Sequence, residues 1–287
     1  MHRLTEKVAE RYDGYKIPDF LRSCMGISVT LIKKVKYGGV FINGVCVTMR
    51  AKVAAGDTVD VNLPAEKSEG IRPIQMPLDI VYEDDHIIAV NKPRGMPTHP
   101  SKGNSLPTLA EGLMAYFEGQ DFVFRSINRL DRDTSGIVIV AKDAYSAAKL
   151  AEEMKRGGYV KKYYAVVTGI PTPDHAVIEA PIERVEEGNI KRCVREDGKD
   201  AKTEYKVLST DASGNSLCEI TLYTGRTHQI RVHMAYFGHP LLYDFLYGES
   251  KAGLDYMLHA RYIEFTHPIT KKRITLISEP DFKQKEE

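Results

Sequence analysis

The apolar residues near the start of the chain recur at the spacing of helix faces. Phe20, Leu21 and Cys24 fall on one face of a helix, and Leu31 and Val35 fall on one face of a second. After a Gly-Gly pair, the runs VFI and VCV flank an Asn-Gly dipeptide, which favours a tight hairpin, and a run TVDV follows. This order predicts a small α+β module.

A segment without periodicity follows the module. Residues 64–77 carry polar side chains, one glycine and three prolines, a composition typical of a linker between domains. We therefore expect three parts: the module at 1–63, a linker at 64–77 and a large domain at 78–287.

The large domain begins with strands and contains two early helices. The stretch LDIVYEDDHIIAVNKP predicts two strands around an acidic turn. Thr108 and Glu111 have the spacing of a capping box, which predicts a helix after Thr108. A second helix is expected from Asp143 to Gly157. Its buried stripe is predicted at four positions with helical spacing: Ala147, Leu150, Ala151 and Met154.

Most of the remaining apolar runs have the length and composition of strands. They are GIVIVAK, YVKKYYAVVTG, HAVIEAP, KTEYKVLS, SLCEITLYT and KRITLIS. Strands outnumber helices and cluster rather than alternate with them. This favours an α+β domain with a mixed, mostly antiparallel sheet over a doubly wound α/β fold.

The distribution of charge is more informative than its total. The formal net charge is +1, yet residues 1–63 hold ten Lys and Arg against six Asp and Glu. The module therefore carries the basic excess, which favours an anionic partner. The four cysteines show no CxxC spacing, so we expect no zinc site, no disulfide framework and a reducing compartment. No window approaches 18 uncharged apolar residues, and we expect a soluble, cytoplasmic protein without membrane contact.

Four alternating charges stand directly before the run GIVIVAK. They are Arg129, Asp131, Arg132 and Asp133. A carboxylate at the edge of a buried strand has a raised pKa unless a partner keeps it ionised. An arginine about 4 Å away supplies roughly 4 kcal/mol at an effective dielectric near 20, which is comparable to the several kcal/mol that burial costs each ion. The pattern does not decide which of the two aspartates matters.

The stretch TGRTHQIRVHMAYFGHP predicts a helix from His228 to Phe237 with Thr227 as its N-cap. Arg226 then lies just before the positive end of this helix, and Arg231 lies one turn inside it. Cations in these places oppose the helix dipole. An anion would resolve the conflict, so Arg226 and Arg231 are candidates for binding a carboxylate or a phosphate. The alternative is that both side chains extend into solvent.

Three stretches in order, NRLDRDTSGIVIVAK, KKYYAVVTG and LYTGRTHQIRVHMAYFGHPLLYD, resemble the sequence motifs of the RluA-type pseudouridine synthases. The flanking stretches IVYEDDHIIAVNKPRGMPTHP and MLHARYIEFTHP are also similar to that family, and the likeness covers nearly all of residues 78–277. The resemblance implies the pseudouridine synthase fold. It also implies isomerisation of uridine to pseudouridine in structured RNA, with no cofactor or metal.

The resemblance also implies roles for individual residues. Asp131 matches the family's nucleophile or general base, and Arg129 matches the arginine that occupies the place of the flipped nucleotide. Tyr163 matches the tyrosine that stacks on the base and is proposed to help remove the proton from carbon five. Arg231 matches the basic residue that pairs with the catalytic aspartate, while Asp133 matches a position without fixed identity and is expected to be a turn residue.

The front module resembles, over roughly residues 16–63, the small RNA-binding module named after the fourth ribosomal small-subunit protein. Lys33, Lys34 and Lys36 are then either RNA phosphate contacts or a solvated helix face. The alternative for the module as a whole is a small unit that only packs on its neighbour.

Several alternatives stay open. Family members with this layout mostly modify large-subunit ribosomal RNA, the 23S RNA of bacteria, and related enzymes act on transfer RNA. A catalytically silent RNA-binding protein is a further possibility, and a hydrolase using Asp131 and Asp133 as an acid and base pair would cleave a glycosidic bond. Asn128 and Tyr243 depart from residues frequent in the family without removing a catalytic group. We expect a monomer. We also expect His228, His233 and His259 to be hydrogen-bonded structural groups or RNA contacts rather than metal ligands.

Overall fold

The computed structural model describes residues 3–64, 70–101 and 105–282. The predicted linker at 64–77 lies partly outside the described residues, because 65–69 are among those left out. None of the helices in the described part of the chain is long and apolar enough to cross a membrane.

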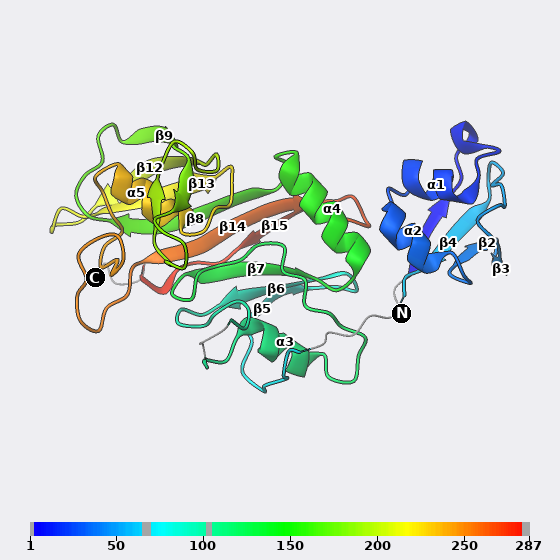
Figure 1. The fold of residues 1–287 in the computed structure, drawn as a ribbon, viewed down its shortest axis with the longest axis horizontal. Helices are drawn as coiled ribbons and strands as arrows, with labels where there is room; N and C mark the ends of the chain where they lie inside the picture. The colour runs from blue at the N-terminus through cyan, green and yellow to red at the C-terminus, as the bar shows by residue number, and fades with distance from the viewer. Residues whose placement is uncertain (1–2, 65–69, 102–104, 283–287) are drawn as a thin grey trace.

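The front module is a four-stranded antiparallel sheet with two short helices (Figure 1). The predicted helices and hairpin are confirmed, and the hairpin turns at Asn43 and Gly44, both with positive φ. The first strand was not predicted, because its sequence RLTEK has a single apolar residue. The strands, in sheet order, are β1 (Arg3–Lys7), β4 (Thr58–Asn62), β2 (Val40–Ile42) and β3 (Val45–Cys46). The two helices are α1 (Ile17–Ser23) and α2 (Val29–Val35), and a 3-10 turn, η1 (Glu10–Tyr12), precedes them.

The module contacts the large domain at the start of helix α4 (Ala144–Lys155). The hydroxyl of Tyr145 donates a hydrogen bond of 2.7 Å to the carbonyl of Met25. The Tyr145 ring belongs to the apolar cluster of the module, and Ile269 packs against the same cluster. The two parts therefore share a small apolar contact.

The large domain is built on a nine-stranded sheet (Figure 1). Its strand order is β5-β6-β7-β14-β8-β13-β12-β9, with β15 paired to β14. Only β7 and β14 run parallel to each other, so the predicted mixed, mostly antiparallel α+β architecture is confirmed. The strands are β5 (Ile80–Glu83), β6 (Ile87–Lys92), β7 (Ser135–Ala141), β8 (Val160–Val167), β9 (His175–Glu179), β12 (Lys202–Thr210), β13 (Ser216–Leu222), β14 (Leu258–Thr266) and β15 (Arg273–Ile277).

All seven residues of β7 are buried because helices cover both faces of the sheet there. On one face, Val138 and Val140 pack with Leu109 and Leu113 of α3 (Leu109–Tyr116). On the other face, Ile137 and Ile139 pack in the cluster that contains Leu150 of α4. A continuous apolar run is the expected signature of such a strand.

The predicted buried stripe of α4 is only partly right. Leu150 is fully buried, but Ala151 is exposed, and Tyr145 and Ser146 are buried in its place. The reason is tertiary, since the first turn of α4 contacts the front module as well as the sheet.

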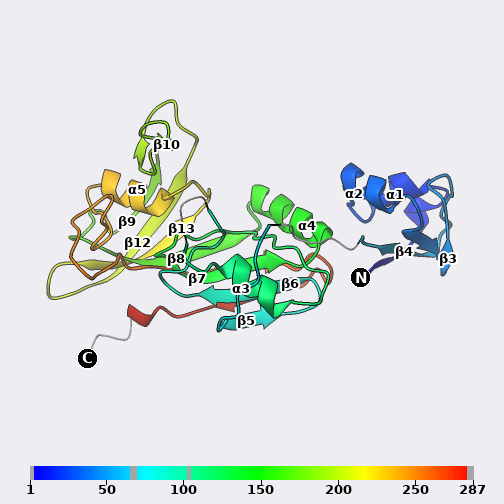
Figure 2. The same cartoon turned by 60° about the horizontal axis from the view of Figure 1, so that its bottom comes forward.

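A small hairpin and one helix rise from the sheet on the same side (Figure 2). The hairpin consists of β10 (Ile182–Arg184) and β11 (Arg192–Val194), and the helix is α5 (Gln229–Tyr236). Val232 of α5 packs against Ile182 and Val194 of the hairpin. This contact fixes the start of α5 beside the hairpin.

The predicted N-cap of α5 is wrong. His228, not Thr227, is the N-cap, and it adopts a left-handed backbone conformation with φ 58° and no capping hydrogen bond from its side chain. The side chain of Gln229 folds back instead, and its amide oxygen accepts hydrogen bonds from the Arg226 backbone at 2.9 Å and from the Thr224 hydroxyl at 2.8 Å.

Candidate active site

A cavity of about 790 Å³ opens where the loop before β7 meets β8 and the turn before α5. We call it the main cavity. Arg129, Asp131, Tyr163 and Arg226, predicted from the sequence, all line it. A smaller recess of about 60 Å³ also lies against Arg129, Asp131 and Tyr163, and its wall includes Arg231. The structure therefore brings together five residues from three separate stretches of the sequence.

Asp131 presents its carboxylate to this space. Its side chain is 30% exposed, and its Oδ2 atom lies 3.8 Å from Nη1 of Arg231 and 3.9 Å from Nε2 of His228. Both distances are too long for direct hydrogen bonds. The carboxylate is thus held near a guanidinium while its oxygens stay available to a ligand.

The guanidinium of Arg231 has a closer partner that the sequence did not identify. Its Nε and Nη2 atoms donate to the two oxygens of Asp244 at 2.7 and 2.8 Å. Both side chains are buried, at 3% and 0% exposure. Burial alone would lower the pKa of Arg231, but the hydrogen bonds and charge of Asp244 hold it above its ordinary value. Asp244 therefore fixes the guanidinium, and the remaining Nη1 atom faces Asp131.

His228 approaches Asp131 from the turn before α5. Its Nδ1 atom is 2.8 Å from the hydroxyl of Tyr247, which orients the ring. Burial lowers the pKa of His228, with the Asp131 charge opposing the shift. A non-glycine residue in the left-handed region is unusual and is often found at functional sites. Nothing in the local sequence indicated this conformation.

Tyr163 stands on β8 with its side chain almost fully buried in the cavity wall. Burial raises the pKa of its hydroxyl well above the ordinary value, and the negative charge of Asp131 raises it further. The group is therefore a neutral phenol near pH 7. It offers a flat apolar surface and a hydroxyl, but not a tyrosinate base in the free protein.

Lys92 is fully buried and holds the loop that carries Asp131 in place. It was not predicted as a site residue from the sequence. The Lys92 ammonium donates to the carbonyls of Pro93, Met96 and Arg132 at 2.9, 2.7 and 3.0 Å. Burial lowers the pKa of Lys92 to about 7, whereas these three acceptors need all three N–H groups of the charged form. A lysine at the end of an otherwise buried strand was the available signal.

Asp133 does not share the cavity with Asp131. It is buried, and Arg132 donates to both of its oxygens at 2.8 and 2.9 Å. Asp133 lies in a turn, as expected, but its pairing with Arg132 was not predicted. A second free carboxylate beside Asp131, which the hydrolase alternative needs, is not present among the residues that line the main cavity.

The remaining predicted contacts are exposed cations. Arg129 and Arg226 are exposed where they line the main cavity, and Nε of Arg226 donates to the carbonyl of Asp200 at 2.9 Å. Lys33, Lys34 and Lys36 are exposed on and just after α2 of the front module.

Two further histidines, His233 and His259, are structural. His233 lies within hydrogen-bond distance of the Thr203 hydroxyl and the Ala180 carbonyl. His259 is placed in the same way between Ser135 and the Ser278 carbonyl. Both rings are buried, and the prediction of hydrogen-bonded structural groups is confirmed for them.

Comparison with known protein families assigns the chain to a family. The family model described as RNA pseudouridylate synthase matches residues 86–236, more than half of the chain, and this segment contains Asp131, Tyr163 and Arg231. The chain belongs to the RNA pseudouridylate synthase family. It is therefore an isomerase that acts on RNA.

Relatives of this pseudouridine synthase cover most of its length. An uncharacterized RNA pseudouridine synthase of Bacillus subtilis (strain 168), YlyB, is 38% identical over 280 residues, which is 94% of this chain and 92% of the relative. Ribosomal large subunit pseudouridine synthase D of Escherichia coli O6:H1 is 36% identical over 249 residues, 80% of this chain and 76% of the relative. The solved structure of human RNA pseudouridylate synthase domain containing 1 matches with a TM-score of 0.60 and 29% identity, covering 72% of this chain and 84% of that one.

Proposed function

We propose that this pseudouridine synthase modifies uridines of large-subunit ribosomal RNA and that Asp131 is its nucleophile or general base. One observation carries the assignment: Asp131 is the single carboxylate that lines the main cavity, as far as the described residues go, and it faces a guanidinium 3.8 Å away. The ribosomal substrate is supported by relatives named as ribosomal large subunit synthases, one of them 36% identical over 80% of this chain.

The chemistry requires access to the sugar and the base. A uridine held in a stack must flip out at a cost of a few kcal/mol. In the isomerisation the bond between C1′ and N1 breaks, a bond between C1′ and C5 forms, C5 loses a proton and N1 gains one. Asp131 either adds to the sugar or removes a ribose proton. Both roles need an ionised carboxylate, which the nearby Arg231 guanidinium favours.

The other residues bind and orient the substrate in this proposal. The exposed guanidinium of Arg129 takes the place that the flipped nucleotide leaves, and Arg226 binds phosphate at the cavity rim. The ring of Tyr163 gives the detached uracil a flat surface to turn on. The Tyr163 hydroxyl assists proton transfer in this proposal, and its raised pKa keeps it neutral in the free protein.

Replacing Tyr163 with phenylalanine is expected to lower the single-turnover rate by about 10²-fold or more, because the hydroxyl that assists proton transfer is removed. RNA affinity should change little, since the aromatic ring remains. The rate is measured as pseudouridine formed with enzyme in excess over RNA. The exposed Tyr236, changed in the same way, is the matched control. An unchanged rate for Tyr163→Phe would assign the proton transfer to another group.

The front module is assigned to RNA binding in the same proposal. Changing Lys33, Lys34 and Lys36 together to glutamine should weaken RNA binding and lower the slope of log affinity against log salt by about 0.7–0.9 for each phosphate that the module no longer binds. Turnover at saturating RNA should stay the same. Lys7, Lys16 and Lys52, also exposed on the module, provide a control triple. If both triple variants weakened RNA binding equally, the module would have only a general electrostatic role.

Tritium release tests the proposed function directly. RNA labelled at C5 of uridine releases tritium only when that carbon loses its proton. Mapping of pseudouridines on ribosomal and transfer RNA after incubation then identifies the substrate. Modification of transfer RNA alone would replace the ribosomal assignment. Free uracil as product would favour the hydrolase, and RNA binding without release would favour a silent binding protein.

A further inference from the structure

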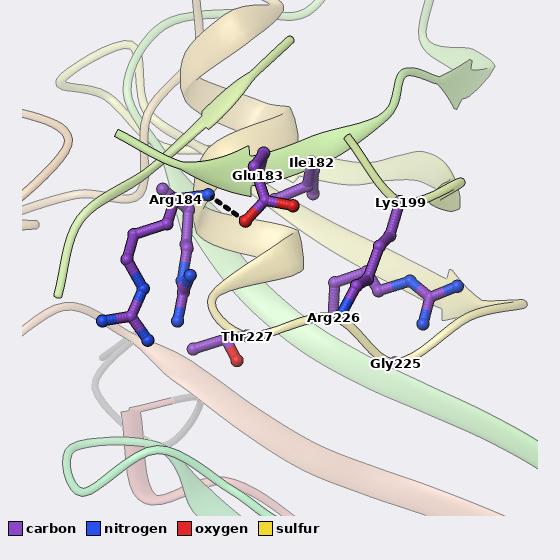
Figure 3. Close-up of a pocket in the computed structure, with 8 residues that line it drawn as sticks. Ile182, Glu183, Arg184, Lys199, Gly225, Arg226 and Thr227 are labelled. Carbon is purple, nitrogen blue, oxygen red and sulfur yellow. Dashed lines mark hydrogen bonds between the residues drawn. The ribbon is translucent and has the colours of Figure 1, made fainter. Parts of the chain in front are cut away.

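A second pocket of about 330 Å³ lies beside the main cavity (Figure 3). The two spaces share a wall, because Gly225, Arg226 and Thr227 line both of them. The opposite walls come from the β10–β11 hairpin and from Lys199. We call this space the basic pocket.

The basic pocket is lined by four cations and one carboxylate. The cations are Arg184, Arg192, Lys199 and Arg226. Figure 3 shows Lys199 and Arg226 close together on the side opposite Arg184. Among the residues that the structure describes, none of these four side chains forms an ion pair. A concave site with an excess of cations creates a field that attracts anions.

Glu183, the carboxylate of the basic pocket, does not neutralise it. Its Oε1 atom accepts a hydrogen bond of 2.8 Å from the backbone N–H of Arg184. This hydrogen bond, together with the charges of Lys199, Arg195 and Arg192, lowers the pKa of Glu183. One ionised carboxylate against four cations leaves a surplus of positive charge.

Arg192 contributes a buried hydrogen-bond donor to the basic pocket. Its Nε atom is buried and has no hydrogen-bond partner within the described ranges. An unsatisfied buried donor costs free energy, and such groups are rare in native structures. A ligand oxygen in the basic pocket would satisfy it.

The hairpin that forms the basic pocket is linked to Asp131. The backbone N–H of Arg192 donates to the hydroxyl of Tyr247 at 2.9 Å. The same hydroxyl lies 2.8 Å from Nδ1 of His228, whose Nε2 atom is 3.9 Å from Asp131. The hairpin backbone therefore contacts Tyr247, which in turn contacts a residue beside Asp131.

We propose that the basic pocket binds a phosphodiester group of the RNA strand next to the target uridine. This inference rests on the proposed function, because it assumes that the uridine enters the main cavity. Guanidinium groups bind phosphate oxygens through paired hydrogen bonds, and phosphate contacts fix the register of a nucleic acid without reading its sequence. The basic pocket thus anchors the strand on one side while the base is flipped.

The first test is the double variant Arg184→Gln/Lys199→Gln. Its dissociation constant for the RNA substrate should rise about tenfold, and its salt slope should fall by about one to two. Turnover at saturating RNA should stay close to that of the wild type. The control is Lys206→Gln/Lys272→Gln, which removes two exposed cations outside the pocket and should leave affinity and slope unchanged. Wild-type affinity and slope in Arg184→Gln/Lys199→Gln would overturn the proposal.

The second test locates the phosphate. Synthetic stem-loop RNAs that carry the mapped uridine receive one neutral methylphosphonate each, at successive linkages around that uridine. At one linkage, replacing the phosphate with a methylphosphonate should weaken RNA binding to the wild-type enzyme about tenfold. The same replacement should have little effect on RNA binding to Arg184→Gln/Lys199→Gln, which has already lost this phosphate contact. Additive losses at every linkage would exclude the basic pocket as a phosphate site. If the wild type forms pseudouridine while this result is obtained, the proposed function stands and only the inference fails.

Discussion

The Asp131→Asn enzyme is expected to lose turnover by about 10⁴-fold or more, the range seen when a reacting side chain is removed from an active site. Asparagine keeps the shape of the side chain but can neither add to the sugar nor accept a proton as a carboxylate does. RNA affinity should change little, because the cations around the main cavity remain. Single-turnover pseudouridine formation and a binding titration with the same RNA measure the two effects separately.

The neighbouring Asp133 supplies the control for this result. Its carboxylate is buried and paired with Arg132, away from the main cavity. Asp133→Asn should therefore retain most of the catalytic rate of the folded enzyme, even if stability falls. An active Asp131→Asn enzyme would refute the assignment of the reacting group.

Removing Asp244 is expected to have the largest effect on stability. Asp244→Ala leaves the guanidinium of Arg231 buried without its carboxylate, which costs about 3–5 kcal/mol. The backbone N–H groups of Leu246 and Tyr247 also lose an acceptor, since Asp244 accepts from both at 3.0 and 3.2 Å. Urea unfolding followed by circular dichroism should show the midpoint falling strongly below that of the wild type.

A paired replacement separates folding from chemistry. Arg231→Met/Asp244→Leu removes both buried charges, so it should recover part of the stability that Asp244→Ala removes. It should remain nearly inactive, because Asp131 then lacks the guanidinium that faces it at 3.8 Å. High activity in the double variant would show that Arg231 is not needed to hold Asp131 ionised.

Much of the fold could be predicted because its signals are local. The residues GIVIVA of the apolar run lie in the fully buried strand β7, and the capping box at Thr108 and Glu111 starts α3 as expected. The Asn43-Gly44 turn joins β2 and β3. Each of these features depends on residues within about one turn or one strand of each other.

Other features could not be predicted, because distant parts of the chain decide them. Tyr145 in the first turn of α4 is buried against the front module, whereas Ala151 is exposed. His228 takes a left-handed conformation and hydrogen-bonds the hydroxyl of Tyr247, nineteen residues further along the chain. Gly136 must lack a side chain, since a Cβ atom there would lie 2.4 Å from the carbonyl oxygen of Ala260 on β14.

For the site, the sequence by itself determined which chemical groups are available. The order of the motifs marked Asp131, Tyr163 and Arg231, and the charge cluster before an apolar strand indicated a carboxylate that needs a positive partner. Hydrophobic patterns and local motifs can be recognised from the sequence because they depend on residues that are close along the chain.

Only the tertiary structure decided how these groups are paired. Two nitrogens of the Arg231 guanidinium hydrogen-bond Asp244, and the third lies 3.8 Å from Asp131. It also fastens the Asp131 loop to Lys92 and gathers four cations into the basic pocket. Ion pairs and buried hydrogen bonds depend on distances of a few ångströms between residues that the sheet brings together. No spacing along the sequence encodes those distances.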